Sequence, residues 1–330
     1  MILVTGGAGF IGSNLVAGLE AAGANNLVIC DILGTDDKWR NIAKRDLADL
    51  IKPDEILSYV DSNASQIEAI FHLGAISATT ETDADLIIDN NFRLSRDLWT
   101  HCAKYRIPLI YASSAATYGD GAAGFVDDAT REHLSRLRPL NAYGWSKHLF
   151  DRWVARILET GSADQSPPQW AGLKFFNVYG PNEYHKEGQV SVALKNYKEI
   201  SAGGPAVLFR SHNPNYSDGG QSRDFVWVGD CVDVMLWLKE NSSVTGLFNL
   251  GTGKARSFAD LATAIFNAAG ISPEIQFIDT PLAIRDKYQY FTEAKMNQLR
   301  DAGYAAPFTS LEDGVSQYVR NFLATEDPYI

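Results

Sequence analysis

The chain of 330 residues contains little cysteine and no cluster of positive charge. Its three cysteines are far apart and form no C-x-x-C spacing, so we expect buried thiols in a reducing compartment and predict no metal site. Lysine and arginine total 29 against 40 aspartates and glutamates, which gives a formal net charge of -11. Because nucleic-acid binding depends on clustered lysine and arginine, this balance argues against a nucleic-acid partner.

Long hydrophobic runs are also missing. No apolar stretch approaches the roughly 20 residues that a membrane-spanning helix requires, so we expect no membrane partner. The first residues carry no basic segment ahead of an apolar run, and they lead straight into glycines, which indicates a first strand and not a signal peptide. We therefore expect a cytoplasmic protein, long enough for one large domain or two smaller ones.

Short aliphatic and β-branched runs recur through the first 180 residues, with helical patterns between them. This alternation predicts a Rossmann-type α/β fold, a doubly wound parallel sheet covered on both faces. After residue 181, polar segments rich in glycine, asparagine and proline indicate loops, and later helical patterns indicate a smaller C-terminal α/β unit. The expected strands are 2–6, 27–31, 69–75, 109–115 and 173–180, and a long amphipathic helix is expected between 141 and 160.

The segment TGGAGFIG, residues 5–12, holds two overlapping glycine fingerprints between a strand and a helix: Gly6, Gly9, Gly12 and Gly7, Gly9, Gly12. The early glycines let the backbone turn and approach a pyrophosphate, and the last permits close packing of helix on strand. The helix N-terminus offers unpaired N–H groups to the anion. Since Asp31 follows 19 residues after Gly12 at the end of the second strand, the pattern predicts a dinucleotide site.

The choice between NAD and NADP stays open from residue chemistry alone. Asp31 favours NAD, because a carboxylate bonds the ribose hydroxyls and repels a 2′-phosphate. Lys38 and Arg40 follow closely enough to reverse this preference if one of them folds back over the ribose.

A second motif, NAYGWSK at 141–147, indicates proton transfer. Tyr143 and Lys147 are four residues apart, so they share one face of the helix with Phe150 and Val154. A tyrosine hydroxyl has a pKa near 10, and each unit by which it is lowered requires about 1.4 kcal/mol of phenolate stabilisation. The lysine ammonium and a nicotinamide-ribose cation can supply this stabilisation.

The third member should be a hydroxyl that orients the substrate oxygen. Ser113, Ser114 and Thr117 lie at the carboxyl end of the strand 109–115, where ligands bind in open α/β sheets. The Y-x-x-x-K spacing is a weak signal by itself, but with the glycine loop it predicts an oxidoreductive acid–base site. A different class of protein, a non-catalytic dinucleotide-sensing regulator, would need the glycine loop and would have no reason to keep Tyr143 and Lys147.

Together these signals resemble the extended short-chain dehydrogenase/reductase family. The segments FHLGA (71–75), RDFVWVGD (223–230) and FNLGTG (248–253) resemble its later landmarks, so the resemblance spans nearly the whole chain. The family's nucleotide-sugar 4,6-dehydratases carry Asp-Glu after the triad threonine, whereas Ala115 and Ala116 follow Ser114 here. The resemblance therefore disfavours dehydration.

Within this family, several segments are most similar to the nucleotide-sugar epimerases that invert carbon six of an ADP-linked heptose, a precursor of the lipopolysaccharide core. They are SSAATYG (113–119), PLNAYGWSK (139–147), FFNVYGPNEYHK (175–186), RDFVWVGD (223–230) and YQYFT (288–292). The similarity implies an isomerase with a 6-keto intermediate, tightly held NADP with NAD as the alternative, and a homo-oligomer, a pentamer in that branch. A UDP-hexose 4-epimerase, which uses the same triad and a transient ketone, stays open.

The resemblance also implies roles for individual residues. Ser114, Tyr143 and Lys147 would be the triad, and Lys186, from the family's His-Lys pair, a second acid/base. Lys38 stands where the family's lysine suits NADP. The implied substrate contacts are Asn177, Phe209, Arg223 and Tyr288. The implied cofactor contacts are Gly6, Gly7, Gly9, Phe10, Ile11, Gly12, Asp31, Ile32, Lys38, Leu73, Ala75, Ser77, Asn90, Tyr143, Lys147, Val178 and Lys186.

Arg223 would suit the substrate diphosphate, because a guanidinium offers bidentate donors. The alternative is a structural ion pair with Asp224. The chain departs from the family pattern where a serine and a histidine become Gly188 and Lys195, and where the segment 210–222 is longer. These changes bear on the fine specificity for nucleotide and sugar.

The resemblance divides the chain into two units. Residues 1–172 would bind NADP, with 224–254 returning to that unit. Residues 173–223 and 255–330 would bind the substrate.

Overall fold

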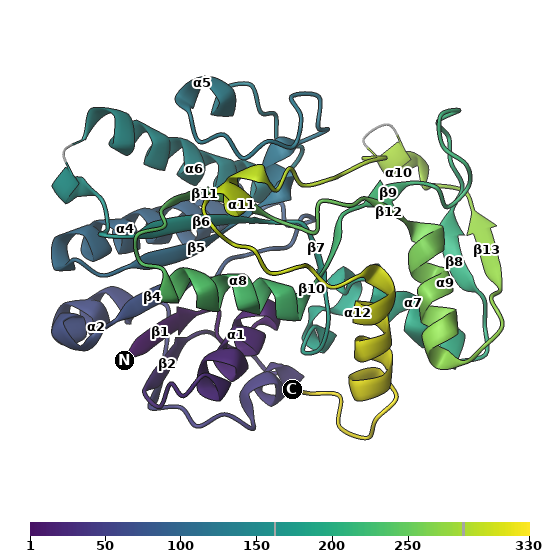
Figure 1. Ribbon diagram of the computed structural model, residues 1–330, viewed down its shortest axis with the longest axis horizontal. Helices are drawn as coiled ribbons and strands as arrows, with labels where there is room; N and C mark the ends of the chain where they lie inside the picture. Colours follow the sequence, from purple (N-terminus) through teal and green to yellow (C-terminus); the bar gives the residue numbers. More distant parts are fainter. Residues whose placement is uncertain (162, 286–287) are drawn as a thin grey trace.

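A seven-stranded parallel sheet forms the centre of the protein in the computed structural model, which describes residues 1–161, 163–285 and 288–330 (Figure 1). Its strand order is β11-β6-β5-β4-β1-β2-β3, so the order reverses between β1 and β4. This arrangement confirms the predicted Rossmann-type fold. The strands are β1 (Ile2–Thr5), β2 (Leu27–Cys30), β3 (Asp49–Ile51), β4 (Ala69–His72), β5 (Leu109–Ser114), β6 (Trp170–Phe175) and β11 (Gly246–Leu250).

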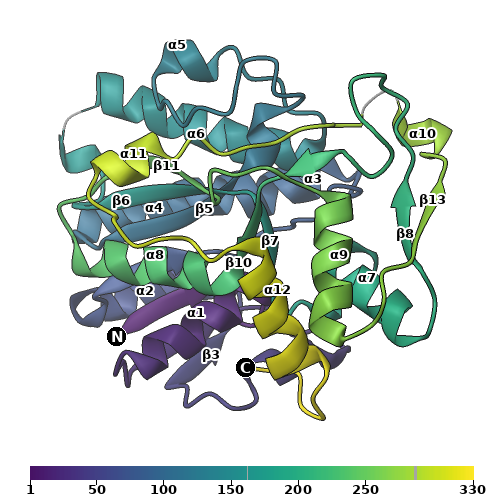
Figure 2. The ribbon, with the colours of Figure 1, turned by 45° about the vertical axis from the view of Figure 1, so that its right-hand side comes forward.

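Helices cover both faces of this sheet (Figures 1 and 2). On one side lie α1 (Phe10–Ala21) and α8 (Val228–Glu240), which pack against each other. On the other side lie α4 (Leu94–Tyr105) and α6 (Ala142–Thr160), with α2 (Ile56–Asn63) packed beside α4. Each of these helices connects or follows strands of the parallel sheet, as a doubly wound fold requires.

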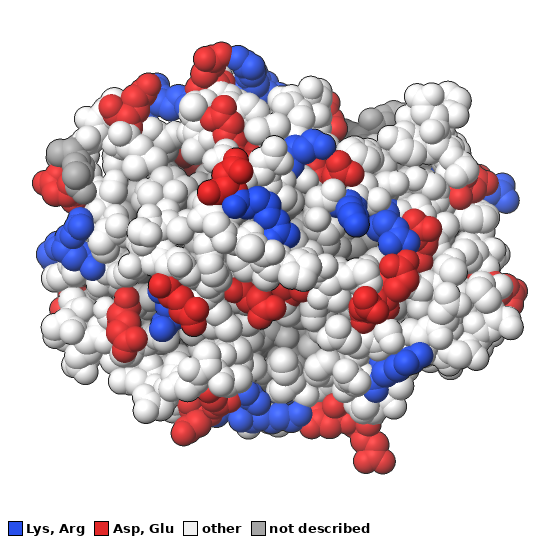
Figure 3. All heavy atoms as spheres, viewed as in Figure 1, with Lys and Arg blue, Asp and Glu red and all other residues white. Residues whose placement is uncertain are grey.

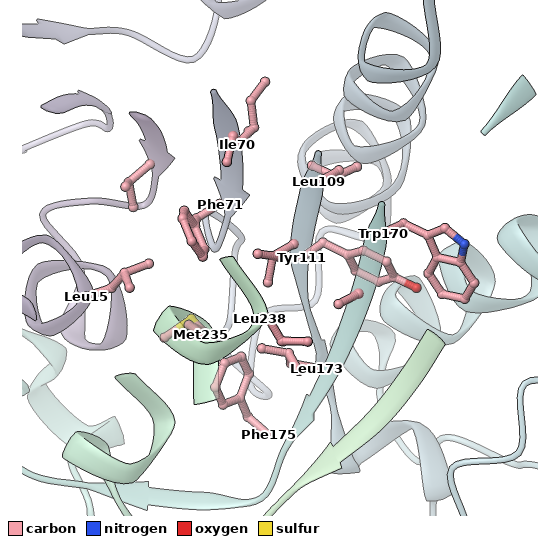
Figure 4. Close-up of a cluster of buried hydrophobic side chains, with 14 of the residues drawn as sticks. Leu15, Ile70, Phe71, Leu109, Tyr111, Trp170, Leu173, Phe175, Met235 and Leu238 are labelled. Atoms are coloured by element: carbon pink, nitrogen blue, oxygen red, sulfur yellow. The ribbon is translucent and has the colours of Figure 1, made fainter. Parts of the chain in front are cut away.

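The first core lies between the sheet and these helices. Figure 4 shows Leu15 of α1 with Met235 and Leu238 of α8, gathered around Phe71 and Leu173 from the strands. All five side chains are fully buried. On the opposite face the ring of Trp99 in α4 meets those of Phe150 and Trp153 in α6, at 6.3 and 6.1 Å between centroids. Burying such side chains is the main source of stability for a sheet covered on both faces.

A second, smaller core lies at the right of Figure 1, around α9. Its helices are α7 (Val192–Ser201), α9 (Phe258–Ala269) and α12 (Leu311–Tyr318). Three two-stranded sheets accompany them: β10 (Phe225–Trp227) with β7 (Asn177–Tyr179), β12 (Arg256–Ser257) with β9 (Ser222–Arg223), and β13 (Ile275–Ile278) with β8 (Ala206–Phe209).

The chain crosses between the two cores more than once. β11 belongs to the central sheet, and the segment around α11 (Asn297–Asp301) also returns to the first core through Ala294, Met296, Leu299 and Tyr304. These four residues fall within the range 255–330, which the sequence assigns to the substrate unit. The division into two units stays a prediction.

One strand prediction was partly wrong. The segment 173–180 divides at Phe176, so that β6 stays in the central sheet and β7 pairs with β10 instead. The backbone N–H of Phe176 still bonds the carbonyl of Leu250, while its ring packs near Tyr118 and Phe125. The break turns Asn177 away from the sheet.

The remaining short elements connect these parts. They are α3 (Ala84–Ile87), α5 (Arg131–Leu134), α10 (Leu282–Arg285), the 3-10 turns η1 (Asp37–Ile42), η2 (Ala64–Gln66), η4 (Ala115–Tyr118), η5 (Ala163–Gln165) and η6 (Tyr184–Gln189), and the π-helical turns η3 (Ile88–Arg93) and η7 (Val319–Leu323).

The three cysteines are buried and unpaired, as predicted. Figure 3 shows Lys and Arg side chains interspersed with Asp and Glu on the face that it draws. Among the described helices, none has the length and apolar character to cross a membrane.

Candidate active site

The glycine loop lies where the strand order of the sheet reverses. Gly6, directly after β1, has a left-handed backbone with φ of +66°, and a Cβ there would stand 2.7 Å from the amide nitrogen of Gly74, after β4. A Cβ on Gly12 would stand 2.0 Å from the carbonyl oxygen of Gly6. Only glycine fits at these positions, because backbone atoms fill the space that a side chain would need.

The N-terminus of α1 opens at this loop. Gly9 is its N-cap and has no side chain to bond the first N–H groups, and the first turn carries no acidic residue. These N–H groups and the positive end of the helix dipole suit a bound anion. The loop therefore fits the diphosphate of a nucleotide by its space and by its donors.

Asp31, at the end of β2, is joined directly to this loop. Its Oδ2 accepts a hydrogen bond from the backbone N–H of Ala8 at 2.9 Å. Its Oδ1 accepts from Lys38 Nζ at 2.6 Å, and the same ammonium donates to the carbonyl of Ile32 at 2.9 Å. The guanidinium of Arg40 lies instead over the ring of Tyr329, 5.6 Å from its centroid. Of the two candidate cations, Lys38 is the one that folds back onto Asp31.

The other residues expected to contact a cofactor are spread around this loop. Leu73 and Ala75 flank Gly74, whereas Ser77 is exposed further along the same segment. Ile32 is 65% exposed beside Asp31, and Asn90 Nδ2 in η3 donates to the carbonyl of Leu86 in the preceding α3. The remaining positions are Gly7 and Ile11 in the glycine loop and α1, and Val178 in β7.

The predicted triad residues meet at the carboxyl end of β5. The hydroxyl groups of Ser114 and Tyr143 are hydrogen-bonded, and Ser114 Oγ also accepts from the N–H of Ala116 at 3.1 Å. Ser113 Oγ instead donates to Asp151 at 2.7 Å, and Thr117 Oγ1 donates to the carbonyl of Ser114 at 2.7 Å. Of the three hydroxyls that the sequence offered, Ser114 is the one bonded to Tyr143.

Helix α6 carries Tyr143 and Lys147 on its inward face. Asn141 caps the helix, with its side chain accepting from the N–H of Gly144 at 2.8 Å. A Cβ on Gly144 would stand 2.7 Å from the carbonyl oxygen of Ala116, so the first turn packs tightly on η4. This close approach brings Tyr143 to Ser114.

Burial controls the electrostatics of this pair. It raises the pKa of Tyr143, while the hydrogen bond from Ser114 opposes that rise. Burial also lowers the pKa of Lys147 to about 8, and the negative charge of Asp151 opposes this change. Lys147 stands one helical turn from Tyr143 on the same inward face of α6, a spacing from which an ammonium can favour a phenolate.

A pocket of about 280 Å³ opens in front of Ser114 and Tyr143. Two predicted substrate residues, Asn177 and Arg223, line it as well. The full lining is Thr79, Ser114, Ala115, Ala116, Gly119, Leu140, Asn141, Tyr143, Phe175, Phe176, Asn177, Arg223, Gln289 and Thr292.

Arg223 is nine-tenths buried at the edge of this pocket, and burial lowers its pKa. Its guanidinium donates to the carbonyls of Ser222 and Gln289 and lies 5.6 Å from the centroid of the Tyr288 ring. Phe209 packs edge-on against Tyr288 at 6.0 Å. Phe209 and Tyr288 therefore support Arg223 from behind and are outside the pocket lining.

The alternative of an ion pair between Arg223 and Asp224 was wrong. The carboxylate of Asp224 accepts hydrogen bonds from the backbone N–H groups of Thr252, Gly253 and Ala294, at 2.7 to 3.0 Å. Those donors hold it away from the guanidinium.

Lys186 lies on η6, at the glycine-loop side of the site. Its Nζ is 5.3 Å from the centroid of the Phe10 ring. Burial lowers its pKa, and the nearby Glu183 opposes this change. Lys186 is absent from the lining of the pocket formed by the described residues, so the structure brings it to the start of α1 and not to Tyr143.

The segment 181–186 is tied to the glycine loop through Asn41. The Nδ2 of Asn41 lies within 3.1 Å of the carbonyl of Ala8, the carbonyl of Asn182 and the Nδ1 of His185. Asn182, itself in a left-handed backbone, donates to Ser13 Oγ at 3.0 Å. These bonds fix the distance between η6 and the loop that fits the diphosphate.

Sequence reasoning missed several residues of this region. Gln289, Thr79 and Thr292 line the pocket from distant segments, and no local pattern marks them. Asp151 could have been found, because it stands four residues after Lys147 on the same helix face.

Comparison with known proteins identifies the family. Residues 2–251 match the family model described as the NAD dependent epimerase/dehydratase family. The chain belongs to this family. Members of this family are enzymes that use a nicotinamide dinucleotide. The glycine loop and Asp31 fit a cofactor of this kind.

The curated relatives are full-length. The ADP-L-glycero-D-manno-heptose-6-epimerase of Nitratidesulfovibrio vulgaris is 51% identical over 332 residues, covering all of both chains. The enzyme of the same name from Fusobacterium nucleatum subsp. nucleatum is 47% identical over 338 residues, again over all of both chains. The crystal structure of the Helicobacter pylori ADP-L-glycero-D-manno-heptose-6-epimerase superposes with a TM-score of 0.78 at 26% identity, covering 97% of this chain and 95% of that one.

Proposed function

We propose that this protein is an isomerase that interconverts ADP-D-glycero-D-manno-heptose and ADP-L-glycero-D-manno-heptose. The observation that carries the proposal is one pocket lined by the hydrogen-bonded Ser114 and Tyr143 and by Arg223, in a chain 51% identical over its whole length to an enzyme of that name. The product would serve synthesis of the lipopolysaccharide core.

The cofactor of this reaction would be NADP. The glycine loop would hold its diphosphate, with the N–H groups of α1 as donors. Lys38 would offset the charge of Asp31 beside a 2′-phosphate, because its ammonium already bonds that carboxylate at 2.6 Å. The exposed side chain of Ile32 offers an apolar surface beside these charges for the base. When bound, such a nucleotide would supply reversible hydride transfer at carbon six of the sugar.

Tyr143 Oη would take the proton of the hydroxyl on carbon six and give it back at the end of the reaction. Burial opposes the phenolate, and the ammonium of Lys147, one helical turn away, would favour it. Ser114, bonded to Tyr143, would orient the substrate oxygen toward the phenol.

Inversion requires the sugar ketone to present both of its faces to the same hydride donor. One acid/base group serves two orientations poorly, so we propose Lys186 as the second group. Because burial lowers its pKa, the Lys186 ammonium gives up a proton more readily than an exposed lysine would. In this structure Lys186 lies over the ring of Phe10. To act as the second acid/base, it would have to approach the sugar when substrate binds, through a movement of η6 or of the sugar.

The substrate diphosphate would lie against Arg223, whose guanidinium keeps donors for an anion at the edge of the pocket. Asn177 would contact the sugar from the opposite segment. Phe209 and Tyr288 would hold Arg223 in place from behind.

We propose further that residues 1–172 with 224–254 form the cofactor unit, and that 173–223 with 255–330 form the substrate unit. The enzyme would work as a homo-oligomer in the cytoplasm.

The reaction is tested by incubating the protein with ADP-D-glycero-D-manno-heptose and observing the hydrogen on carbon six by proton NMR. We expect an equilibrium mixture of the two epimers. Inversion of carbon four in UDP-glucose, with no change in the heptose, would contradict the proposal and support a UDP-hexose 4-epimerase. Absorbance and mass of the nucleotide released on denaturation would distinguish NADP from NAD.

A further inference from the structure

A buried ion pair lies directly beneath the triad. Asp151 stands one helical turn beyond Lys147 and two beyond Tyr143, so the three share one face of α6. Its Oδ2 is 2.7 Å from Nζ of Lys174 in β6, and both side chains are completely shielded from solvent. Buried charges are costly unless they are paired and hydrogen-bonded, so the contacts of this pair indicate what it holds in place.

Its contacts reach each element that carries the triad. Ser113, the register partner of Lys174 in the neighbouring strand, donates to Asp151 Oδ2 at 2.7 Å. Lys174 Nζ donates to Thr117 Oγ1 at 2.7 Å, and that hydroxyl donates to the carbonyl of Ser114 at 2.7 Å. The end of β5, η4 and α6 are therefore joined through one carboxylate and one ammonium.

We propose that Asp151, held by Lys174, is a positioning residue that fixes the end of β5 and places a negative charge one helical turn beyond Lys147, so that Ser114 and Tyr143 meet. This assignment rests on the proposed function, because it gives the pair a task in the acid–base chemistry of Tyr143.

The charges around Lys147 make the proposal testable. Asp151 acts on it from its own helix, and His72 lies near it on β4. His72 stays neutral, because burial and Lys147 lower its pKa to about 3. Lys174 from β6 is paired with Asp151 at 2.7 Å. Removing the carboxylate would leave the buried ammonium of Lys174 without its partner and would take away the negative charge that opposes the lowering of the Lys147 pKa.

Three variants separate positioning by charge from simple structural support: Asp151→Asn, Lys174→Met and the double variant. We expect Asp151→Asn to move the alkaline limb of the pH–kcat profile about one pH unit lower, because the unbalanced ammonium of Lys147 gives up its proton sooner. Lys174→Met should move it higher, and the double variant should return close to the original profile. If the variants lose activity but the alkaline limb does not move in opposite directions in Asp151→Asn and Lys174→Met, the proposal is overturned.

The same shifts can be measured without substrate. Nitrogen-15 NMR of the lysine Nζ groups follows the titration of Lys147, whose signal is assigned by its absence in Lys147→Met. We expect its pKa to fall in Asp151→Asn and to rise in Lys174→Met. If Asp151→Asn does not fold, Lys174→Met and the double variant decide the question, because the double variant contains neither buried charge.

Asp230→Asn is the matched control. Asp230 is also a buried carboxylate on a helix, but it accepts from Thr309 and lies on α8, outside the pocket lining. Its substitution should leave the alkaline limb unchanged. An unchanged Lys147 titration in the folded pair variants would overturn the proposal. Displaced titrations in a protein that does not act on the heptose would overturn the proposed function alone.

Discussion

The glycine loop and the triad are built in opposite ways. The loop is fixed by backbone meeting backbone, since a Cβ on Gly12 would stand 2.0 Å from the carbonyl of Gly6. The predicted triad is surrounded by buried charges and hydroxyls, because the shielded ion pair of Asp151 and Lys174 is hydrogen-bonded to Ser113 and Thr117 at the end of β5. Added atoms in the loop should therefore reduce stability and nucleotide binding. Removal of a charge or a hydroxyl from the triad should reduce activity.

The largest effect should come from the triad. In Tyr143→Phe, the loss of the acid/base hydroxyl should reduce kcat by about 10³-fold. Nucleotide content and the melting temperature should stay close to those of the original protein, because the ring keeps its packing. A rate within a few-fold of the original would show that Tyr143 is not the acid/base group.

The loop should respond to added atoms. Gly12→Ala forces its methyl group into the Gly6 carbonyl, so we expect a loss of about 3 kcal/mol in the free energy of unfolding and loss of bound nucleotide. Urea denaturation and nucleotide analysis of the purified variant measure both. Gly204→Ala is the matched control, because its nearest neighbour would be 3.4 Å away. Equal behaviour of the two variants would contradict the backbone account.

Lys147→Met should stabilise the protein while it removes activity. The pKa of Lys147 is about 8 in the folded state against an ordinary 10.5, so the unfolded state binds this proton more readily. The resulting cost, about 3 kcal/mol, is complete below pH 8 and disappears above about pH 10.5. The variant should thus gain stability at pH 7 and gain little at pH 10.5, as measured by urea denaturation. A loss at pH 7 would mean that Lys147 supports the fold.

The smallest effect concerns cofactor choice. Lys38→Ala should weaken NADP binding about tenfold, or about 1.4 kcal/mol, and change NAD binding much less. Arg40→Ala, in which the guanidinium over Tyr329 is removed, should leave the ratio of the two affinities nearly unchanged. Isothermal titration with each nucleotide measures this ratio. A larger loss for Arg40→Ala would assign the 2′-phosphate to the other cation.

These contrasts also explain what the sequence could reveal. The glycine loop and the Tyr143–Lys147 spacing are local patterns, because a strand-to-helix turn and one helical turn impose them. The sheet followed from the alternation of strands and helices. The choice of Ser114 among the three hydroxyls could not be predicted, because it depends on the hydrogen-bond partners of the neighbouring Ser113 and Thr117.

Contacts between distant segments were out of reach. The break at Phe176 results from pairing of β7 with β10, about 50 residues later, which no local propensity reveals. The position of Lys186 over Phe10 depends on the bonds of Asn41 to Ala8 and Asn182. The long segment 210–222 is held by Tyr216 against Tyr290, at 5.1 Å between ring centroids.

The most direct test of the account follows the hydrogen on carbon six in deuterium oxide. If it leaves and returns as a hydride beside Tyr143, ADP-D-glycero-D-manno-heptose should be inverted while carbon six keeps its protium, as seen by proton NMR and mass. Deuterium at carbon six of the inverted sugar, or no inversion by the nucleotide-loaded protein, would contradict the account.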